Sequence, residues 1–141
     1  MNIKTGNPVL SAIDTGLALS GDEVSVYFAE DGERLDFVVN RGEWTGYERA
    51  QVMAALATYA AVSNLTFRIA DDPVSATFKV TKSASEHGSL GFMNGPDPAY
   101  GAAQGLAWFN TEFHWGGART GLLDPGSYSF TIFLHEFGHG L

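Results

Sequence analysis

The sequence contains no cysteine, few basic residues and no long apolar run. Without cysteine, disulfide scaffolds and thiolate chemistry are excluded, so any metal must be bound by His, Asp or Glu. Eight Lys and Arg stand against 16 Asp and Glu, and the formal net charge of -8 disfavours nucleic acid and anionic membranes as partners. No apolar run approaches the roughly 18 residues that span a bilayer, which predicts a soluble chain.

Length and composition favour one globular domain. The chain has 141 residues, and 45% of them are apolar, which is enough to supply a core. Glycine and proline gather in turns, and neither a linker nor an internal repeat is visible. Near the N-terminus, Lys4 precedes a stretch broken by glycine and polar residues. We therefore expect a single domain over residues 1–141 and no cleaved signal peptide.

Short β-rich runs recur along the chain. Residues 24–28 and 35–39 alternate apolar with small or polar residues around a turn-like segment, which predicts two early strands in a candidate hairpin. Further strands are expected at 65–70, 76–81 and 106–113. The glycine-rich residues 83–105 are expected to form a long loop, which a compact domain usually keeps for function.

Two helices are expected. Thr45 and Glu48 match a capping box, and apolar residues then recur at three- and four-residue intervals to about Asn64. A second helix begins near Ser127. The first helix lies between strands and is long enough for a crossover connection. The order predicts an α+β, or mixed α/β, fold with a twisted, mostly parallel sheet of about five strands and two long helices.

The second helix carries an H-E-x-x-H motif that begins at His135 and ends at His139. Four residues advance a helix by about 400°, so the two imidazoles lie roughly 40° apart on one face and can meet one zinc ion. Glu136 lies about 100° around, where its carboxylate can reach a metal-bound water. Zinc lowers the pKa of such a water to about 7, and a neighbouring carboxylate can take its proton. The motif predicts amide hydrolysis with Glu136 as general base.

The surroundings of the motif support this interpretation. Residues 130–134 form an apolar stretch that can bury the helix face away from the metal. Gly138 and Gly140 reduce helix propensity, which suggests that another part of the chain approaches closely there. The alternative is an exposed terminal helix whose histidines only interact favourably with its negative end. That alternative gives Glu136 no role.

Residues 131–141 resemble the active-site helix of serralysin-type metalloproteases, which belong to the metzincins. Residues 46–67 are similar to the first long helix and following strand of that family, and residues 105–110 to the strand that lines its substrate cleft. Residues 6–28 are similar to its N-terminal segment. The resemblance therefore covers most of the chain and implies a zincin-like N-terminal subdomain of a metallopeptidase catalytic domain.

The resemblance also implies roles for individual residues. His135 and His139 would be zinc ligands, and Glu136 would be the base of a zinc-dependent endopeptidase. The substrate-binding residues would be Ala107, Trp108, Phe109 and Asn110. The expected cofactor is one catalytic zinc ion, and the expected substrate is a protein or peptide.

In serralysin-type proteases the motif continues to a third histidine six residues after the second. A methionine turn and calcium-binding glycine-rich repeats follow, and these repeats accompany type I secretion. The resemblance thus places the third ligand and any calcium beyond Leu141, so we expect residues 1–141 alone to be inactive. We also expect a monomer that is secreted by a route without a signal peptide. The nearest competing family is the gluzincins, whose third ligand is a downstream glutamate.

A second hypothesis makes the chain a non-catalytic, β-rich module that binds peptide or glycan. It rests on 17 glycines, 13% aromatic residues and an aromatic group in residues 108–115 that would form an edge strand for an extended peptide. The members of this group are Trp108, Phe109, Phe113 and Trp115. Packing in the core explains the same residues equally well.

The remaining polar candidates have simpler explanations. His87 and His114 have no partner at a helical spacing, so we expect them at the surface rather than on a metal. Several aspartates are in turns, where aspartate commonly accepts hydrogen bonds from nearby backbone, and we do not expect them to form a calcium site. These residues are Asp71, Asp72, Asp97 and Asp124.

Overall fold

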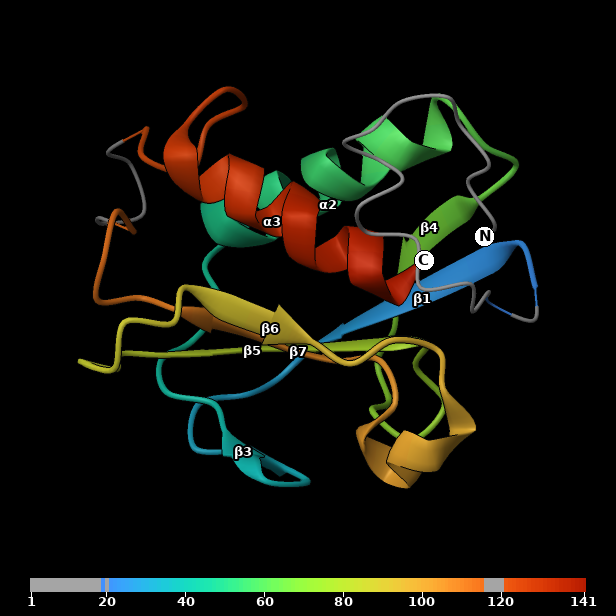
Figure 1. Ribbon diagram of the computed structural model, residues 1–141, viewed down its shortest axis with the longest axis horizontal. Coiled ribbons are helices and arrows are strands. Elements are labelled where there is room, and N and C mark those ends of the chain that lie inside the picture. The colour runs from blue at the N-terminus through green and yellow to red at the C-terminus, as the bar shows by residue number, and fades with distance from the viewer. Residues whose placement is uncertain (1–18, 20, 116–120) are drawn as a thin grey trace.

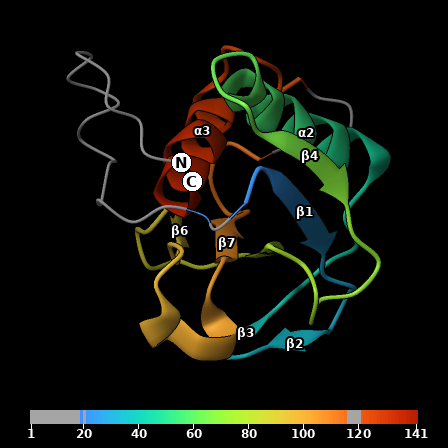
Figure 2. The same ribbon diagram turned by 90° about the vertical axis from the view of Figure 1, so that its right-hand side faces the viewer.

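The computed structural model describes residue 19 and residues 21–115 and 121–141. Most of the N-terminal segment in the family resemblance lies outside these ranges. Two helices cover one face of a five-stranded sheet, and a small two-stranded sheet and a 3-10 helix lie on the other side (Figures 1 and 2). No helix among the described residues has the length and apolar character needed to cross a bilayer.

The main sheet is mixed and mostly parallel, as the sequence predicts. Its strands stand in the order β4-β1-β5-β7-β6, and β6 alone runs antiparallel to its neighbour. The five strands are β1 (Glu23–Phe28), β4 (Thr66–Ile69), β5 (Phe78–Ser83), β6 (Gly91–Met93) and β7 (Leu106–Asn110). The predicted fold class, mixed α/β with about five strands, is confirmed.

The helix α2 (Gly46–Ala60) begins at the predicted capping box. The Thr45 hydroxyl accepts from the Glu48 amide at 3.2 Å, and the Glu48 carboxylate accepts from the Thr45 amide at 2.9 Å. The helix ends at Ala60, earlier than expected. Because α2 lies in the connection from β1 to its parallel neighbour β4, it provides the crossover that a parallel pair requires.

The expected hairpin of residues 24–28 with 35–39 is wrong. The second stretch is divided into β2 (Arg34–Leu35) and β3 (Val38–Val39), which pair with each other in a separate sheet. Asp36 has a φ of 53°, a left-handed conformation that turns the chain between them. β1 cannot accept another partner because β4 and β5 already occupy its two edges.

The segment expected to be one long loop contains two elements. These are β6 and the 3-10 helix η1 (Pro98–Ala103). The chain leaves η1 through Gly105, whose φ is 72° and where a Cβ would come within 2.0 Å of the Thr77 carbonyl oxygen. Only glycine fits this close approach, which leads into β7. β7 itself ends at Asn110, three residues earlier than expected.

The main core lies between the sheet and the two helices. The second helix, α3 (Tyr128–Gly140), starts at Ser127 as predicted, and the Ser127 hydroxyl accepts from the Phe130 amide. Its buried residues Phe133 and Phe137 pack edge-to-face on Phe109 of β7. The apolar stretch before the motif thus turns one face of α3 to the sheet, as expected.

Candidate metal centre

Packing on both sides determines how α3 presents its motif. Phe133 and Phe137 are fully buried on the sheet side, and from α2 the Tyr59 hydroxyl donates to the Leu134 carbonyl oxygen at 2.6 Å. Burial raises the pKa of Tyr59 to about 12, so the hydroxyl keeps the proton that it donates. With these faces occupied, His135 is exposed and His139 is partly buried on the remaining surface of the helix.

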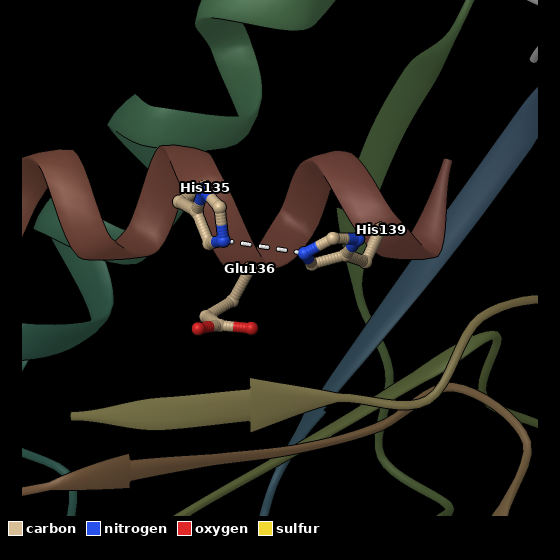
Figure 3. A group of neighbouring side chains, drawn as sticks. All are labelled: His135, Glu136 and His139. Carbon is tan, nitrogen blue, oxygen red and sulfur yellow. Dashed lines mark hydrogen bonds between the residues drawn. The ribbon is translucent and has the colours of Figure 1, made fainter. Parts of the chain in front are cut away.

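The two imidazoles face each other on that surface (Figure 3). Their Nε2 atoms are 3.2 Å apart and their ring centroids 4.8 Å apart. Two nitrogens that share a tetrahedral zinc ion at 2.0–2.1 Å would be separated by about 3.3 Å. The separation of the two nitrogens therefore matches that of two ligands on one zinc ion. The motif predicted this pairing from spacing alone.

Glu136 leaves α3 in a different direction, toward the yellow strand β6 (Figure 3). It is partly buried, and its Cγ lies 3.4 Å from the position that a Cβ on Gly91 would take. Ligand atoms of Glu136 and both histidines lie within 4.8 Å of one another. The carboxylate is thus beside the imidazole pair and next to the first residue of an edge strand.

Burial changes the pKa of two groups in this cluster of His135, Glu136 and His139. It raises the pKa of the Glu136 carboxyl, and the nearby His135 partly opposes that shift. A carboxylate with a raised pKa is a stronger base at neutral pH. Burial and the charge of His135 lower the pKa of His139, which favours the neutral imidazole that a metal requires. The raised pKa of Glu136 suits its predicted role as a base, and the lowered pKa of His139 suits its predicted role as a metal ligand.

The last turn of α3 lies very close to the segment that contains β6. A Cβ at Gly140 would come within 2.3 Å of the Met93 Cε atom and 3.0 Å of Phe78. A Cβ at Gly95 would lie 2.9 Å from the His139 carbonyl oxygen. The expectation that a neighbour approaches at Gly140 is confirmed, and the neighbours are Met93 of β6 and Phe78 of β5.

β7, which carries the four predicted substrate-binding residues, is an interior strand. It is hydrogen-bonded to β5 on one edge and to β6 on the other, so its backbone has no free edge for a peptide. Ala107 and Phe109 are buried toward the helices, whereas Trp108 lies on the other face, stacked on Phe92 and donating to the Ser83 hydroxyl at 2.6 Å. Asn110 is buried and bonded within the protein.

The aromatic group of residues 108–115 does not form one surface, and the expected edge strand is wrong. Trp108 and Phe109 point to opposite faces of the sheet. Trp115 is buried and donates to the Glu48 carboxylate, while Phe113 is 41% exposed. Among the described residues, the free edge on this side of the sheet belongs to β6. Sequence reasoning missed this strand because three residues among glycines give no periodic pattern.

The other polar candidates lie away from the cluster. His87 and His114 are exposed, and the His114 ring packs against Tyr128. Two of the aspartates accept hydrogen bonds from nearby backbone in turns, as expected: Asp72 accepts from the Val74 amide and Asp97 from the Ala99 amide. Asp124 instead accepts from the distant Tyr47 hydroxyl of α2.

Comparison with known proteins finds no matching family model and no matching curated protein. The geometry of the cluster and the pattern of the motif are therefore the grounds for a functional hypothesis.

Proposed function

We propose that the chain forms the zinc-binding part of a zinc-dependent endopeptidase. His135 and His139 hold the metal, and Glu136 is the general base. The 3.2 Å separation of the two Nε2 atoms carries the proposal, because it matches the separation that one tetrahedral ion imposes. A simple interaction of the histidines with the helix terminus would leave the position of Glu136 unexplained.

Zinc at this position would polarise a carbonyl group and lower the pKa of a bound water. The Glu136 carboxylate would take the proton of the attacking water and pass it to the departing amide nitrogen. Among the described residues, only burial and His135 shift the pKa of Glu136, and no hydrogen-bond donor does. The carboxylate oxygens are therefore available for a proton.

The free edge of β6 supports a peptide as the substrate. β6 is the last strand of the sheet, and its first residue, Gly91, lies against Glu136. An extended peptide can pair with such an edge through main-chain hydrogen bonds, which would bring an amide to the base. This edge strand beside the base therefore favours a protein or peptide substrate.

The resemblance to serralysin-type metzincins supports the same proposal and adds to it. On the basis of this resemblance we propose a third histidine ligand six residues after His139, which would complete the set of protein ligands on the zinc. On the same basis we propose secretion by a type I route and calcium binding outside the described residues. The non-catalytic binding module is not retained, because the residues on which it depended lie on different faces and in the core.

The test is the Glu136→Gln variant of the protein as its gene encodes it. The amide keeps the size of the side chain but cannot take a proton, so peptide cleavage should fall by roughly 10²–10⁴-fold while zinc content stays the same. Glu86→Gln, at an exposed position of the loop before β6, is the matched control and should retain activity. Undiminished cleavage by the Glu136 variant would refute the mechanism.

A further inference from the structure

The Asn110 side chain uses its full hydrogen-bonding capacity inside the protein. Nδ2 donates to the carbonyl oxygens of Ser85 and Ser89 at 2.8 Å each, and Oδ1 accepts from the amides of Ser85 at 3.0 Å and Glu112 at 2.9 Å. An asparagine amide has two donor hydrogens and two acceptor lone pairs. With an exposed fraction of 3%, the side chain is not available to contact a substrate.

These bonds hold the segment that leads into β6. Ser85 and Ser89 lie near the ends of the loop before Leu90. The backbone amide of Asn110 also donates to the Leu90 carbonyl oxygen at 3.0 Å. The next residue, Gly91, is the one that faces Glu136. A single buried side chain at the end of β7 therefore connects the sheet to the start of the edge strand at the candidate site.

β6 needs such support because it has little stability of its own. It has three residues, whereas the most common strand length is about five or six, and in the described part of the chain β7 is its one hydrogen-bonded neighbour. The loop before it is mostly exposed. Its position relative to α3 is therefore set by the contacts at its two ends. At the end next to Glu136, Asn110 provides four of them, three from its side chain and one from its backbone amide.

We propose that Asn110 is a positioning residue that holds the β6 edge opposite Glu136, so that a bound peptide lies in reach of the base. The effect on cleavage rests on the proposed function, whereas the effect on β6 does not. Asparagine is required because two of its partners are carbonyl oxygens, which need a donor. An aspartate of the same size would direct an oxygen at both of them.

The first experiment compares Asn110→Asp with Asn40→Asp by hydrogen exchange. Asn40 is a matched control, because it is fully buried and its side-chain amide also makes four hydrogen bonds, but none of them is to residues 85–94. Asn110→Asp should accelerate amide exchange in residues 85–94 by roughly tenfold or more relative to the rest of the chain. Asn40→Asp should not accelerate that segment selectively. Equal acceleration there in both variants would overturn the proposal.

Two further measurements keep the test decisive. In the unsubstituted protein both Nδ2 protons of Asn110 should exchange slowly with water, which can be measured even if Asn110→Asp does not fold; fast exchange would contradict the proposal.

In the zinc-loaded protein, Asn110→Asp should raise KM several-fold with a smaller change in kcat, and Asn40→Asp should change neither. A loss in kcat alone would argue against positioning. No cleavage by the unsubstituted protein as its gene encodes it would refute the peptidase, while hydrogen exchange would still decide the role of Asn110.

Discussion

At the scale of single residues, the histidine pair shows which parts of a site are determined locally. Helix geometry brings residues four apart onto one face whatever surrounds them, so the spacing of His135 and His139 was sufficient to predict their contact. Their common surface needs no long-range packing to exist. What packing adds is the burial that shifts the pKa values of His139 and Glu136.

The paired imidazoles make a direct prediction about zinc affinity. His139→Ala removes one of the two nitrogens, so zinc should bind weaker by more than the roughly 10–100-fold that loss of an outer hydrogen-bond partner costs. Titration against a chelator of known zinc affinity measures the change. His87→Ala, at an exposed position outside the cluster, is the control and should bind zinc as the unsubstituted chain does. Equal affinity of the two variants would exclude His139 as a ligand.

Asn110 shows the opposite case, because its partners cannot be found from nearby sequence. Ser85 and Ser89 are 25 and 21 residues away from it. The family resemblance suggested a substrate contact for Asn110, but only the fold shows that its amide is enclosed. A residue whose role depends on distant backbone groups carries no local signal.

At the scale of elements, predictability follows the length of the element. α2 and α3 have 15 and 13 residues, enough for caps and periodicity to indicate them reliably. β6 has three residues, and β2 and β3 have two each, which is shorter than any recognisable alternation. The strand expected at 35–39 was wrong because the left-handed Asp36 turns the chain. Aspartate tolerates that conformation but also adopts extended ones, so the residue by itself does not determine the turn.

The contact of α3 with β6 makes a prediction about Gly140. Alanine there would improve helix propensity by up to about 1 kcal/mol, but its Cβ would clash with buried Met93 and Phe78. Overpacking of this kind costs about 1–3 kcal/mol, so Gly140→Ala should lower the free energy of unfolding in urea. Gly46→Ala is the control, because no atom lies within 4 Å of its new Cβ. A Gly140→Ala variant as stable as the control would contradict the close packing.

At the scale of the whole molecule, a buried ion pair connects elements that are distant in sequence. Lys82 of β5 donates to both oxygens of Glu48 of α2 at 2.8 Å, and Trp115 donates to the same carboxylate. The side chains of Lys82 and Glu48 are only 9% and 5% exposed. Sequence reasoning identified Glu48 as part of a cap, but it could not assign the lysine, because the pairing depends on how α2 crosses the sheet.

Glu48 therefore makes a prediction about acid stability. Burial by itself raises the pKa of its carboxyl, but hydrogen bonds from Lys82, the Thr45 amide and Trp115 outweigh it and hold the pKa below its ordinary value of 4.5. A carboxyl whose pKa is lower in the folded state stabilises the protein fully above the unfolded-state pKa, and this contribution disappears as the pH falls through the lower folded-state value. Stability should accordingly be constant near neutrality and decline below about pH 4.5.

Other carboxyl groups also titrate in acid, so the measurement needs a variant that removes only this pair. Glu48→Gln with Lys82→Met replaces both charges, which avoids leaving one of them buried without a partner at a cost of about 3–5 kcal/mol. Thermal unfolding from pH 7 to pH 3 should then show a shallower decline below pH 4.5 in the double variant than in the unsubstituted chain. Because Asp72, whose pKa is also lowered, remains in both proteins, its contribution cancels in the comparison. Identical pH profiles would mean that the ion pair does not account for acid lability.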